Sequence, residues 1–475
     1  MSEFDYDLLV IGSGPGGLRA AYHAAKMNKK VAIVERKAVV GGVSVNTGTI
    51  PSKTLREAII DLTGFHEKTF YGQSFQVKQN ITIEDLLKRT DLVIRHEIDV
   101  LRDQLARNGI ELIHATASFC DPQTINLEPV EGKGLRLARA RVVVIASGTQ
   151  ATRAPTIPFD GRDVLTSDDI LTMDRLPKTL AVVGGGVIGI EYASMFAALG
   201  VRVTLIERSQ ELLPFVDREI VDDLIYHLRE ARATLRLGEE VATAKKVDDG
   251  GVPRVQIVLA SGKTIAVEKA LYSIGRTGNT AMMNLEAAGL TADERGRLKV
   301  NENYETATPG IYAVGDVIGF PSLASTSMEQ GRLAANHAFG CPVRSFPEFL
   351  PYGIYSIPEI SMCGRTEEDL TKAGVPYEIG KARFREIARG QIIGDTSGML
   401  KLCVHAETRE LLGVHIIGAQ ATELVHIGQA VMTLKGRIDY FVDTVFNYPT
   451  LAEGYKIAAL DATNRLNTYA PVHSR

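Results

Sequence analysis

Two segments of the chain share one succession of apolar, glycine-rich and helix-forming residues. In each, a short apolar run with β-strand character enters a glycine cluster, continues into an alanine-rich helical stretch, and is followed by a second apolar run that ends in an acid. The first segment reads DLLVIGSGPGGLRAAYHAA and then KVAIVERK, and the second reads TLAVVGGGVIGIEYASMFAALG and then VRVTLIERS. A strand, a glycine turn and a helix in this order predict two Rossmann-like dinucleotide-binding domains.

Apolar spacing elsewhere predicts the arrangement of the remaining chain. Residues 83–108 carry apolar side chains at helical spacing and predict one long amphipathic packing helix. Residues 140–150 and 309–319 predict strands that run into glycine-containing turns. Because the second Rossmann unit lies between these strands, we expect it to be inserted into a discontinuous first domain. After about residue 344, strand-rich segments followed by ATELVHIGQAVMTL predict an α+β end domain.

The glycines of each fingerprint have separate tasks. In the first, Gly12 allows a tight turn, Gly14 lets the backbone approach a pyrophosphate, and Gly17 permits close packing of the helix on the strand. The helix N-terminus would face the anion, and Glu35 at the end of the next strand would accept hydrogen bonds from the ribose hydroxyls. The second fingerprint repeats this set with Gly184, Gly186, Gly189 and Glu207.

Two dinucleotides in one chain indicate hydride transfer between a flavin and a nicotinamide, since that exchange needs no protein nucleophile. We therefore expect FAD in the first domain and NAD or NADP in the second. The expected α/β fold has a FAD-binding domain of residues 1–155 and 273–343, an NAD(P)-binding domain of residues 156–272, and a C-terminal interface domain of residues 344–475.

Length and charge narrow the choice of partner. A chain of 475 residues is too long for one compact core, which agrees with several domains. The formal net charge is −4 and like charges form no long block, so neither nucleic acid nor a membrane surface is indicated as a partner. The N-terminus lacks the pattern of a secretion signal, and no apolar run is long enough for a membrane span. We expect a cytoplasmic protein that acts on small molecules.

The cysteines and histidines carry no local metal or redox pattern. Cys120, Cys341, Cys363 and Cys403 show no CxxC spacing, and the ten histidines show no HxxxH or HExxH spacing. We expect the cysteines to be small buried apolar side chains, and we expect no metal site.

Further motifs accompany the two fingerprints, namely GGVSVNTGTIPSK at 41–53, ASGT at 146–149, GRTGN at 275–279, YAVGD at 312–316 and YPTLAE at 448–453. Over essentially its whole length the chain therefore resembles the pyridine nucleotide–disulfide oxidoreductases, which include lipoamide dehydrogenase, glutathione reductase and mercuric reductase. The resemblance implies a homodimer or higher homo-oligomer, whose C-terminal dimerisation domain completes the partner's active site.

The same resemblance assigns roles to individual residues. Asp316 would bind the ribityl and phosphate region of FAD, and Lys53 would lie beside the flavin N5, paired with Glu191. The other motif residues that would line the cofactor sites are Gly42, Ser44, Thr49, Gly148 and Gly275.

Departures from the family pattern affect its redox centre. Disulfide reductases read GGxCxNxGCxPSK, whereas this chain has Ser44 and Thr49 at the two cysteine positions. Tyr448 replaces the catalytic histidine before Pro-Thr, although Glu453, the acid that would orient that histidine, remains. A hydroxyl neither forms a charge-transfer pair with flavin nor attacks a disulfide, so disulfide reduction is excluded. Tyr448 either takes part in the reaction or simply fills the space of the histidine.

The segments GTIPSK and FNYPTLAE resemble the soluble pyridine nucleotide transhydrogenase branch of the family, of the Si-specific type. This resemblance implies the reaction NADPH + NAD⁺ ⇌ NADP⁺ + NADH by a ping-pong route through FAD, without a redox disulfide. Members of this branch can keep the first cysteine, so Ser44 is a further departure. Two alternatives stay open: an NAD(P)H dehydrogenase with a quinone, a dye-like molecule or oxygen as acceptor, and a catalytically idle member that serves as a binding or structural dimer.

Transhydrogenation requires one pocket to accept both NAD and NADP. Glu207 stands where an acid normally accepts the 2′-hydroxyl of NAD and repels a 2′-phosphate. The guanidinium of the adjacent Arg208 can bind a phosphate through charge-assisted hydrogen bonds. We expect the pair to alternate, with Glu207 swinging aside for NADP. The alternative is that Arg208 is a solvated surface charge.

Overall fold

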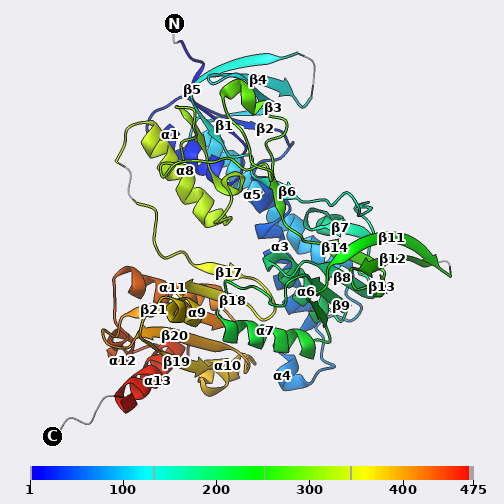
Figure 1. The fold of residues 1–475 in the computed structure, drawn as a ribbon, viewed down its shortest axis with the longest axis vertical. Coiled ribbons are helices and arrows are strands. Elements are labelled where there is room, and N and C mark those ends of the chain that lie inside the picture. The colour runs from blue at the N-terminus through cyan, green and yellow to red at the C-terminus, as the bar shows by residue number, and fades with distance from the viewer. Residues whose placement is uncertain (1–2, 132–133, 251, 343–344, 470–475) are drawn as a thin grey trace.

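The computed structural model describes residues 3–131, 134–250, 252–342 and 345–469 (Figure 1). Its N-terminal nucleotide unit is a sheet around β1 (Tyr6–Ile11), which pairs in parallel with β2 (Val31–Glu35) and with the end of β5 (Arg136–Ile145). β16 (Ile311–Ala313) adds to β5 in parallel. β3 (Glu111–Asp121) pairs with β2 and then forms an antiparallel meander with β4 (Thr124–Pro129) and the start of β5. Continuous apolar runs such as LLVI suit strands that are covered on both faces.

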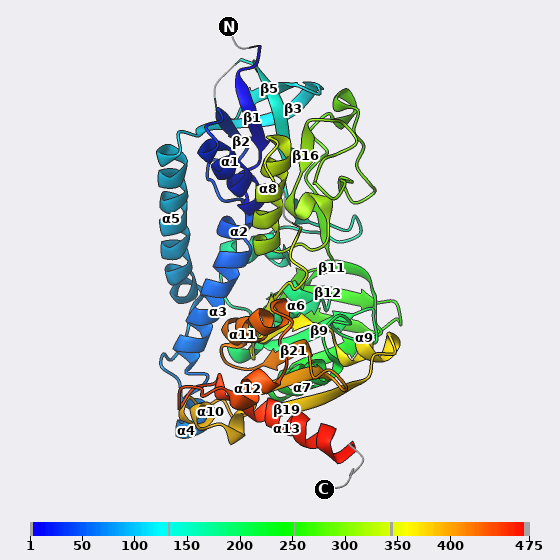
Figure 2. The same ribbon diagram turned by 90° about the vertical axis from the view of Figure 1, so that its left-hand side faces the viewer.

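Long helices cover this unit and connect it to the rest of the molecule (Figure 2). α1 (Pro15–Lys26) packs closely on α8 (Ala324–Ala338), because a Cβ added to Gly331 would lie 2.1 Å from the carbonyl oxygen of Gly16. α5 (Ile83–Arg107) shares a core with α1 and contacts α3 (Thr49–Thr63). The amphipathic helix predicted over residues 83–108 is thereby confirmed, and it begins at a capping box formed by Thr82 and Asp85.

The second nucleotide unit has a parallel sheet in the order β10 (Thr234–Leu237), β9 (Arg202–Glu207), β8 (Thr179–Val183), β14 (Lys269–Tyr272) and β7 (Val164–Thr166). The helices α6 (Val187–Ala198) and α7 (Arg218–Glu230) belong to it. An antiparallel sheet of β11 (Val241–Asp249), β12 (Val252–Leu259) and β13 (Thr264–Val267) lies beside it.

The chain passes between the two nucleotide units through a short antiparallel pair, β6 (Thr149–Ala151) and β15 (Arg276–Gly278). After this return, β16 joins the first sheet. The second unit is thus enclosed in sequence by strands of the first, while the numbered domain limits stay predictions.

The C-terminal unit is an antiparallel sheet in the order β17 (Tyr352–Ile354), β18 (Ile360–Gly364), β21 (Leu411–Ile417), β20 (Met399–His405) and β19 (Tyr377–Arg383). It packs against α11 (Ala421–Thr433) and α13 (Glu453–Tyr469), and it also contacts α7 of the second unit (Figure 1). The α/β fold with two Rossmann-like units and an α+β C-terminal unit is therefore confirmed.

Short helices complete the described chain. They are α2 (Gly42–Asn46), α4 (Lys68–Tyr71), α9 (Glu367–Lys372), α10 (Ala388–Ile392), α12 (Asp439–Asp443) and the 3₁₀ turns Ser167–Thr172, Leu285–Ala288, Gly315–Ile318 and Phe384–Glu386.

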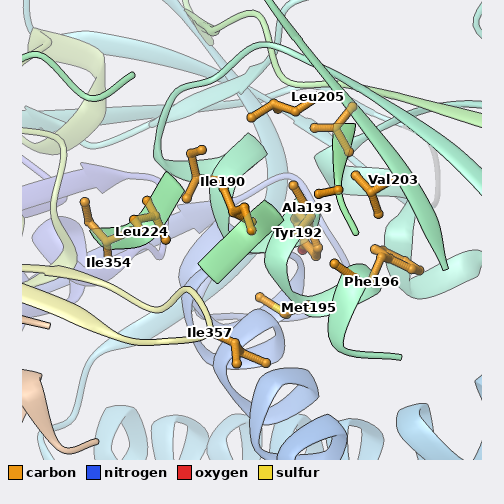
Figure 3. Packing of buried hydrophobic residues seen from close by; sticks show 14 of the residues in the cluster. Ile190, Tyr192, Ala193, Met195, Phe196, Val203, Leu205, Leu224, Ile354 and Ile357 are labelled. Atoms are coloured by element: carbon orange, nitrogen blue, oxygen red, sulfur yellow. The ribbon is translucent and has the colours of Figure 1, made fainter. Parts of the chain in front are cut away.

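Helix α6 lies at the centre of the largest apolar cluster (Figure 3). Its residues from Gly189 to Ala197 are all buried, as expected for a helix that is apolar on every side. Leu55 and Ile59 of α3 and Ile357 of the C-terminal unit belong to the same cluster. The three units therefore share one core around α6.

The expectation that the cysteines are buried is wrong for two of them. Cys363 and Cys403 are buried in the C-terminal sheet, but Cys120 is exposed and Cys341 is half-buried beside Met27. Successive side chains of a strand point to opposite faces, so Phe119 of β3 is buried while Cys120 faces solvent. No helix in the described part of the chain has the length and apolar character to cross a membrane.

Candidate functional site

A cleft of about 370 Å³ lies at the carboxyl ends of β1, β2, β5 and β16. This edge of an open α/β sheet is where ligands bind in such folds. The structure brings together here the following residues assigned to FAD from the sequence: Gly12, Gly14, Glu35, Gly42, Ser44, Thr49, Gly148 and Asp316.

The first fingerprint has the geometry that a pyrophosphate requires. Gly12 has φ +107°, and a Cβ there would lie 2.4 Å from the carbonyl oxygen of Ala146. A Cβ at Gly17 would lie 2.2 Å from the carbonyl oxygen of Gly12, so strand and helix approach closely. A Cβ at Gly14 would meet no described atom within 4 Å. The N-terminus of α1 is thus open to an anion.

Glu35 is held at the rim of this cleft by backbone and side-chain donors. The amide of Ser13 donates to Oε2 at 3.0 Å, its hydroxyl donates to the same oxygen at 2.6 Å, and the amide of Lys37 donates to Oε1 at 2.9 Å. The amide of Gly41 donates to Ser13 Oγ at 3.0 Å. The side chain that would receive the ribose hydroxyls is therefore oriented before any ligand arrives.

The other side of the cleft offers polar groups that need a partner. Burial raises the pKa of Asp316, and the nearby charge of Arg276 opposes this effect. Thr149 Oγ1 accepts from Arg276 Nε at 2.8 Å and donates to Asp316 Oδ2 at 3.3 Å. Ser147 Oγ is buried without a hydrogen-bond partner in the described structure. A polyhydroxylated ligand such as the ribityl chain of FAD would satisfy such groups.

Lys53 and Glu191 form an ion pair between α3 and α6. Lys53 Nζ donates to both carboxylate oxygens of Glu191 at 2.9 Å. The side chain of Lys53 is 25% exposed and that of Glu191 is 5% exposed. The ammonium therefore stays accessible on one side, while the carboxylate that holds it is buried.

The second fingerprint repeats the geometry of the first. Gly184 has φ +104°, and a Cβ at Gly189 would lie 1.9 Å from its carbonyl oxygen. A Cβ at Gly186 would meet nothing within 4 Å among the described atoms. Glu207 accepts from the amides of Gly185 at 2.6 Å and Ser209 at 2.8 Å. Glu207 is thus tied to the backbone at both oxygens, as Glu35 is.

Two further residues named from the sequence follow strands of the second unit, Arg208 after β9 and Gly275 after β14. Arg208 is exposed and makes no hydrogen bond or ion pair within the described chain. Gly275 has φ +120° in the segment that leads to β15, where the chain returns to the first unit.

Comparison with known proteins identifies the family. A model described as "Pyridine nucleotide-disulphide oxidoreductase" matches residues 6–331, and the dimerisation domain of the same family matches residues 350–459. The chain belongs to this family. Membership implies FAD and the nicotinamide nucleotides NAD and NADP as cofactors, and the open fingerprints and the unpaired Ser147 Oγ fit such ligands.

Relatives of one name cover nearly the full chain. A soluble pyridine nucleotide transhydrogenase of Mycobacterium bovis is 54% identical over 97% of this chain and 98% of its own. Proteins of the same name from Colwellia psychrerythraea and Azotobacter vinelandii are 45% and 44% identical, each over 98% of this chain and over 99% and 100% of their own.

Two solved structures share the fold. The HOCl-induced flavoprotein disulfide reductase RclA from Escherichia coli matches with a TM-score of 0.85 at 27% identity, over 96% of this chain and 99% of its own. LpdA from Mycobacterium tuberculosis matches with a TM-score of 0.87 at 25% identity, over 95% of this chain and 99% of its own.

Tyr448 and Glu453 are not part of the cleft within one chain. Tyr448 is 67% exposed in front of Pro449, and Glu453 begins α13. Glu453 Oε2 is buried without a hydrogen-bond partner among the described residues, and Tyr448 is not bonded to it. The pairing of acid and ring that the family pattern implies for a histidine is therefore not formed by this tyrosine.

The sequence analysis missed residues that support the site. Ser13 orients Glu35, and Arg276 connects Thr149 with Asp168 through a 3.2 Å hydrogen bond. Ser13 stands inside the glycine fingerprint and Arg276 inside GRTGN, so closer attention to the variable motif positions would have found both. Tyr355, which contacts both members of the Lys53–Glu191 pair, carries no local signal.

Proposed function

We propose that this protein is a soluble pyridine nucleotide transhydrogenase that catalyses NADPH + NAD⁺ ⇌ NADP⁺ + NADH. The nucleotides use one site in turn, in a ping-pong order with Si-face specificity, and no redox disulfide takes part. The protein acts as a cytoplasmic homodimer. The names of its near-full-length relatives and the dimerisation-domain match support this proposal.

The hydroxyl side chains that line the cleft are the main support for this proposal. Ser44 and Thr49 line it with hydroxyls at the positions where the disulfide reductases place cysteines. A hydroxyl has neither the nucleophilicity nor the redox chemistry of a thiolate near neutral pH. Electrons that enter this site from one nicotinamide must therefore leave to a second nicotinamide or to another small acceptor, and not to a disulfide.

The remaining residues then have defined tasks. When bound, FAD supplies reversible hydride acceptance, and Gly12, Gly14, Glu35 and Asp316 would hold it. The Lys53 ammonium, kept in place by Glu191, favours the negative charge that accumulates during reduction. In the dimer, the C-terminal unit of one subunit presents Tyr448 and Glu453 to the cleft of the other.

The decisive experiment is an anaerobic titration of the purified holoprotein with NADPH and, separately, with NADH. We expect either nucleotide to reduce the flavin fully with two electrons, without the long-wavelength band of a thiolate–flavin pair. In steady state, NAD⁺ should oxidise the NADPH-reduced enzyme faster than quinones or oxygen do. Faster turnover with a quinone would identify a dehydrogenase instead, and a flavin that neither nucleotide reduces would identify an idle dimer.

A further inference from the structure

The loop between β17 and β18 contacts the helices that carry the Lys53–Glu191 pair. The amide of Tyr355 donates to Glu191 Oε1 at 2.9 Å, and two residues later the amide of Ile357 donates to Ser194 Oγ at 3.0 Å. Glu191 and Ser194 are three residues apart on α6, so both lie on the face that this loop covers. The backbone of this loop thus donates hydrogen bonds to two side chains on one face of α6.

The same loop is fastened to α3. Arg56 Nε donates to the carbonyl oxygen of Ser356 at 2.9 Å, and its Nη2 lies 3.3 Å from Glu359 Oε2 in a buried ion pair. Glu359 also accepts from the amide and the hydroxyl of Thr422, each at 2.7 Å. Arg56 lies three residues after Lys53 on α3. The loop therefore joins α3 and α6 at the point where their ion pair forms.

The side chain of Tyr355 completes the surroundings of the Lys53 ammonium. Lys53 Nζ lies 4.7 Å from the centre of the Tyr355 ring, within the range of a cation–π contact. The Glu191 carboxylate thus accepts hydrogen bonds from two residues. Lys53 Nζ donates to both of its oxygens, and the Tyr355 amide donates to Oε1. The ring limits where the ammonium can move, and the amide limits how the carboxylate can rotate.

We propose that Tyr355 is a positioning residue for the reaction, which holds the Lys53 ammonium in place through its ring and the Glu191 carboxylate through its amide. This inference rests on the proposed function for the task of Lys53. It makes the docking of the C-terminal unit a requirement for the correct geometry beside the flavin, because the ring and the amide both come from that unit. Removing the ring frees the ammonium and weakens its electrostatic effect.

The test compares Tyr355→Leu with Tyr355→Phe, which keeps the ring. Tyr226→Leu is the matched control, because Tyr226 is an exposed tyrosine of α7 whose hydroxyl contacts Glu230. We expect Tyr355→Leu to slow flavin reduction by about 3- to 30-fold, the range of a partly buried cation–π contact, and to lower the flavin midpoint potential. Tyr355→Phe and Tyr226→Leu should change neither quantity by more than about twofold in rate or its equivalent in potential.

A double-mutant cycle with Lys53→Met separates positioning from packing. In the Lys53→Met background, Tyr355→Leu should produce no further change in reduction rate or potential. An effect of full size in that background, or a Tyr355→Phe variant as impaired as Tyr355→Leu, overturns the inference. Because the potential is measured on the resting holoprotein, this outcome is independent of whether NAD⁺ proves to be the acceptor.

Discussion

The adjacent residues Glu207 and Arg208 are held very differently by the fold. Both oxygens of Glu207 accept hydrogen bonds from backbone amides, at 2.6 and 2.8 Å, whereas the exposed Arg208 has no partner in the described chain. Moving Glu207 aside would cost two charge-assisted hydrogen bonds. Arg208, in contrast, is free to close on a 2′-phosphate, so we expect it to be the more mobile member of the pair.

Substituting Glu207 or Arg208 should change the apparent KM values for NADH and NADPH differently. Arg208→Ala should raise the apparent KM for NADPH by about tenfold, as for a lost charged hydrogen bond, and leave the KM for NADH nearly unchanged. Glu207→Ala should weaken NADH and spare NADPH. The 2′ position is remote from the nicotinamide, so the rate of hydride transfer at saturation should stay constant. Both half-reactions are measured for each variant, with Arg202→Ala at the start of β9 as control; equal effects on both nucleotides would contradict the assignment.

Lys53 should affect flavin reduction more than FAD retention. We expect Lys53→Met to slow reduction by either nucleotide by about 10- to 1000-fold, the scale of losing one preorganised electrostatic group. The FAD content should stay at that of the wild type, because the residues that line the cleft are unchanged. Stopped-flow reduction together with flavin quantitation checks this. An unchanged rate would mean that the ammonium does not face the reacting atoms.

The cysteines should be spectators in turnover. Burial raises the pKa of Cys363 to about 11 and raises that of Cys403 as well, so neither thiol reacts readily near neutral pH. Cys120 is exposed, but it lies in β3 outside the lining of the cleft. We expect iodoacetamide to label Cys120 with no loss of transhydrogenase activity, measured beside a mass spectrum. A loss that nicotinamide prevents and thiol reverses would contradict this.

At the scale of elements, α7 is joined to the C-terminal sheet by a buried charge cluster. Lys401 of β20 is 1% exposed and contacts Asp217, the N-cap residue of α7, at 2.9 Å and Glu219 at 3.3 Å, and it also pairs with Glu367 of α9. Oppositely charged neighbours hold the pKa of Lys401 above and those of Asp217 and Glu219 below their usual values, against the effect of burial. The ion pairs of Lys401 with Asp217 and Glu219 thus fix how the second nucleotide unit packs on the C-terminal unit.

Removing this ammonium should destabilise the protein strongly. Lys401→Met leaves the buried Asp217 carboxylate without its counter-charge, and we expect a loss of about 3–5 kcal/mol in the free energy of unfolding. Lys78→Met, which breaks the exposed pair with Asp85, should cost at most about 1 kcal/mol. Urea unfolding of the holoprotein, followed by circular dichroism, compares the two variants. Equal losses would show that the cluster is not coupled to stability.

At the scale of the whole molecule, buried titrating groups predict sensitivity to acid. Burial lowers the pKa of His415 from its usual 6.5. Just below pH 6.5, this histidine is therefore protonated in the unfolded state and neutral in the folded state. Stability should therefore be full above pH 6.5 and decrease below it, by at most about 1.4 kcal/mol per pH unit for one proton. Asp217 and Glu219, whose pKa values are lowered from 3.8 and 4.5, add a second decrease below those values.

Unfolding midpoints in urea between pH 8 and pH 3 check this dependence. The midpoint should be flat on the alkaline side and should fall as the pH drops through the usual range of histidine. His415→Gln should reduce the slope in that first window. A midpoint that rises on acidification would contradict the sign of the His415 contribution.

Local chemistry made much of this fold predictable from the sequence. The fingerprint glycines are required by the local backbone. Gly12 adopts a φ of +107°, and no described atom lies within 4 Å of a Cβ added at Gly14, where a ligand can approach the backbone. The helical period of residues 83–107 and the acids after β2 and β9 are equally local signals. Ser44 and Thr49 stand in the sequence where the disulfide reductases have cysteines, so the basis of the proposal that no redox disulfide takes part needed no structure.

Only the tertiary structure decided which distant residues meet. Lys53 and Glu191 are 138 residues apart, and Asp217 and Lys401 are 184 apart; Tyr355 reaches the first pair from the C-terminal unit. Such contacts depend on how the three units pack around α6. The spacing of apolar residues within one segment does not contain this information. The same reason explains the error at Cys120, since burial depends on which face of β3 is covered. The sequence by itself determined the nucleotide units and placed hydroxyls at positions 44 and 49, and docking decided the surroundings of the Lys53 ammonium.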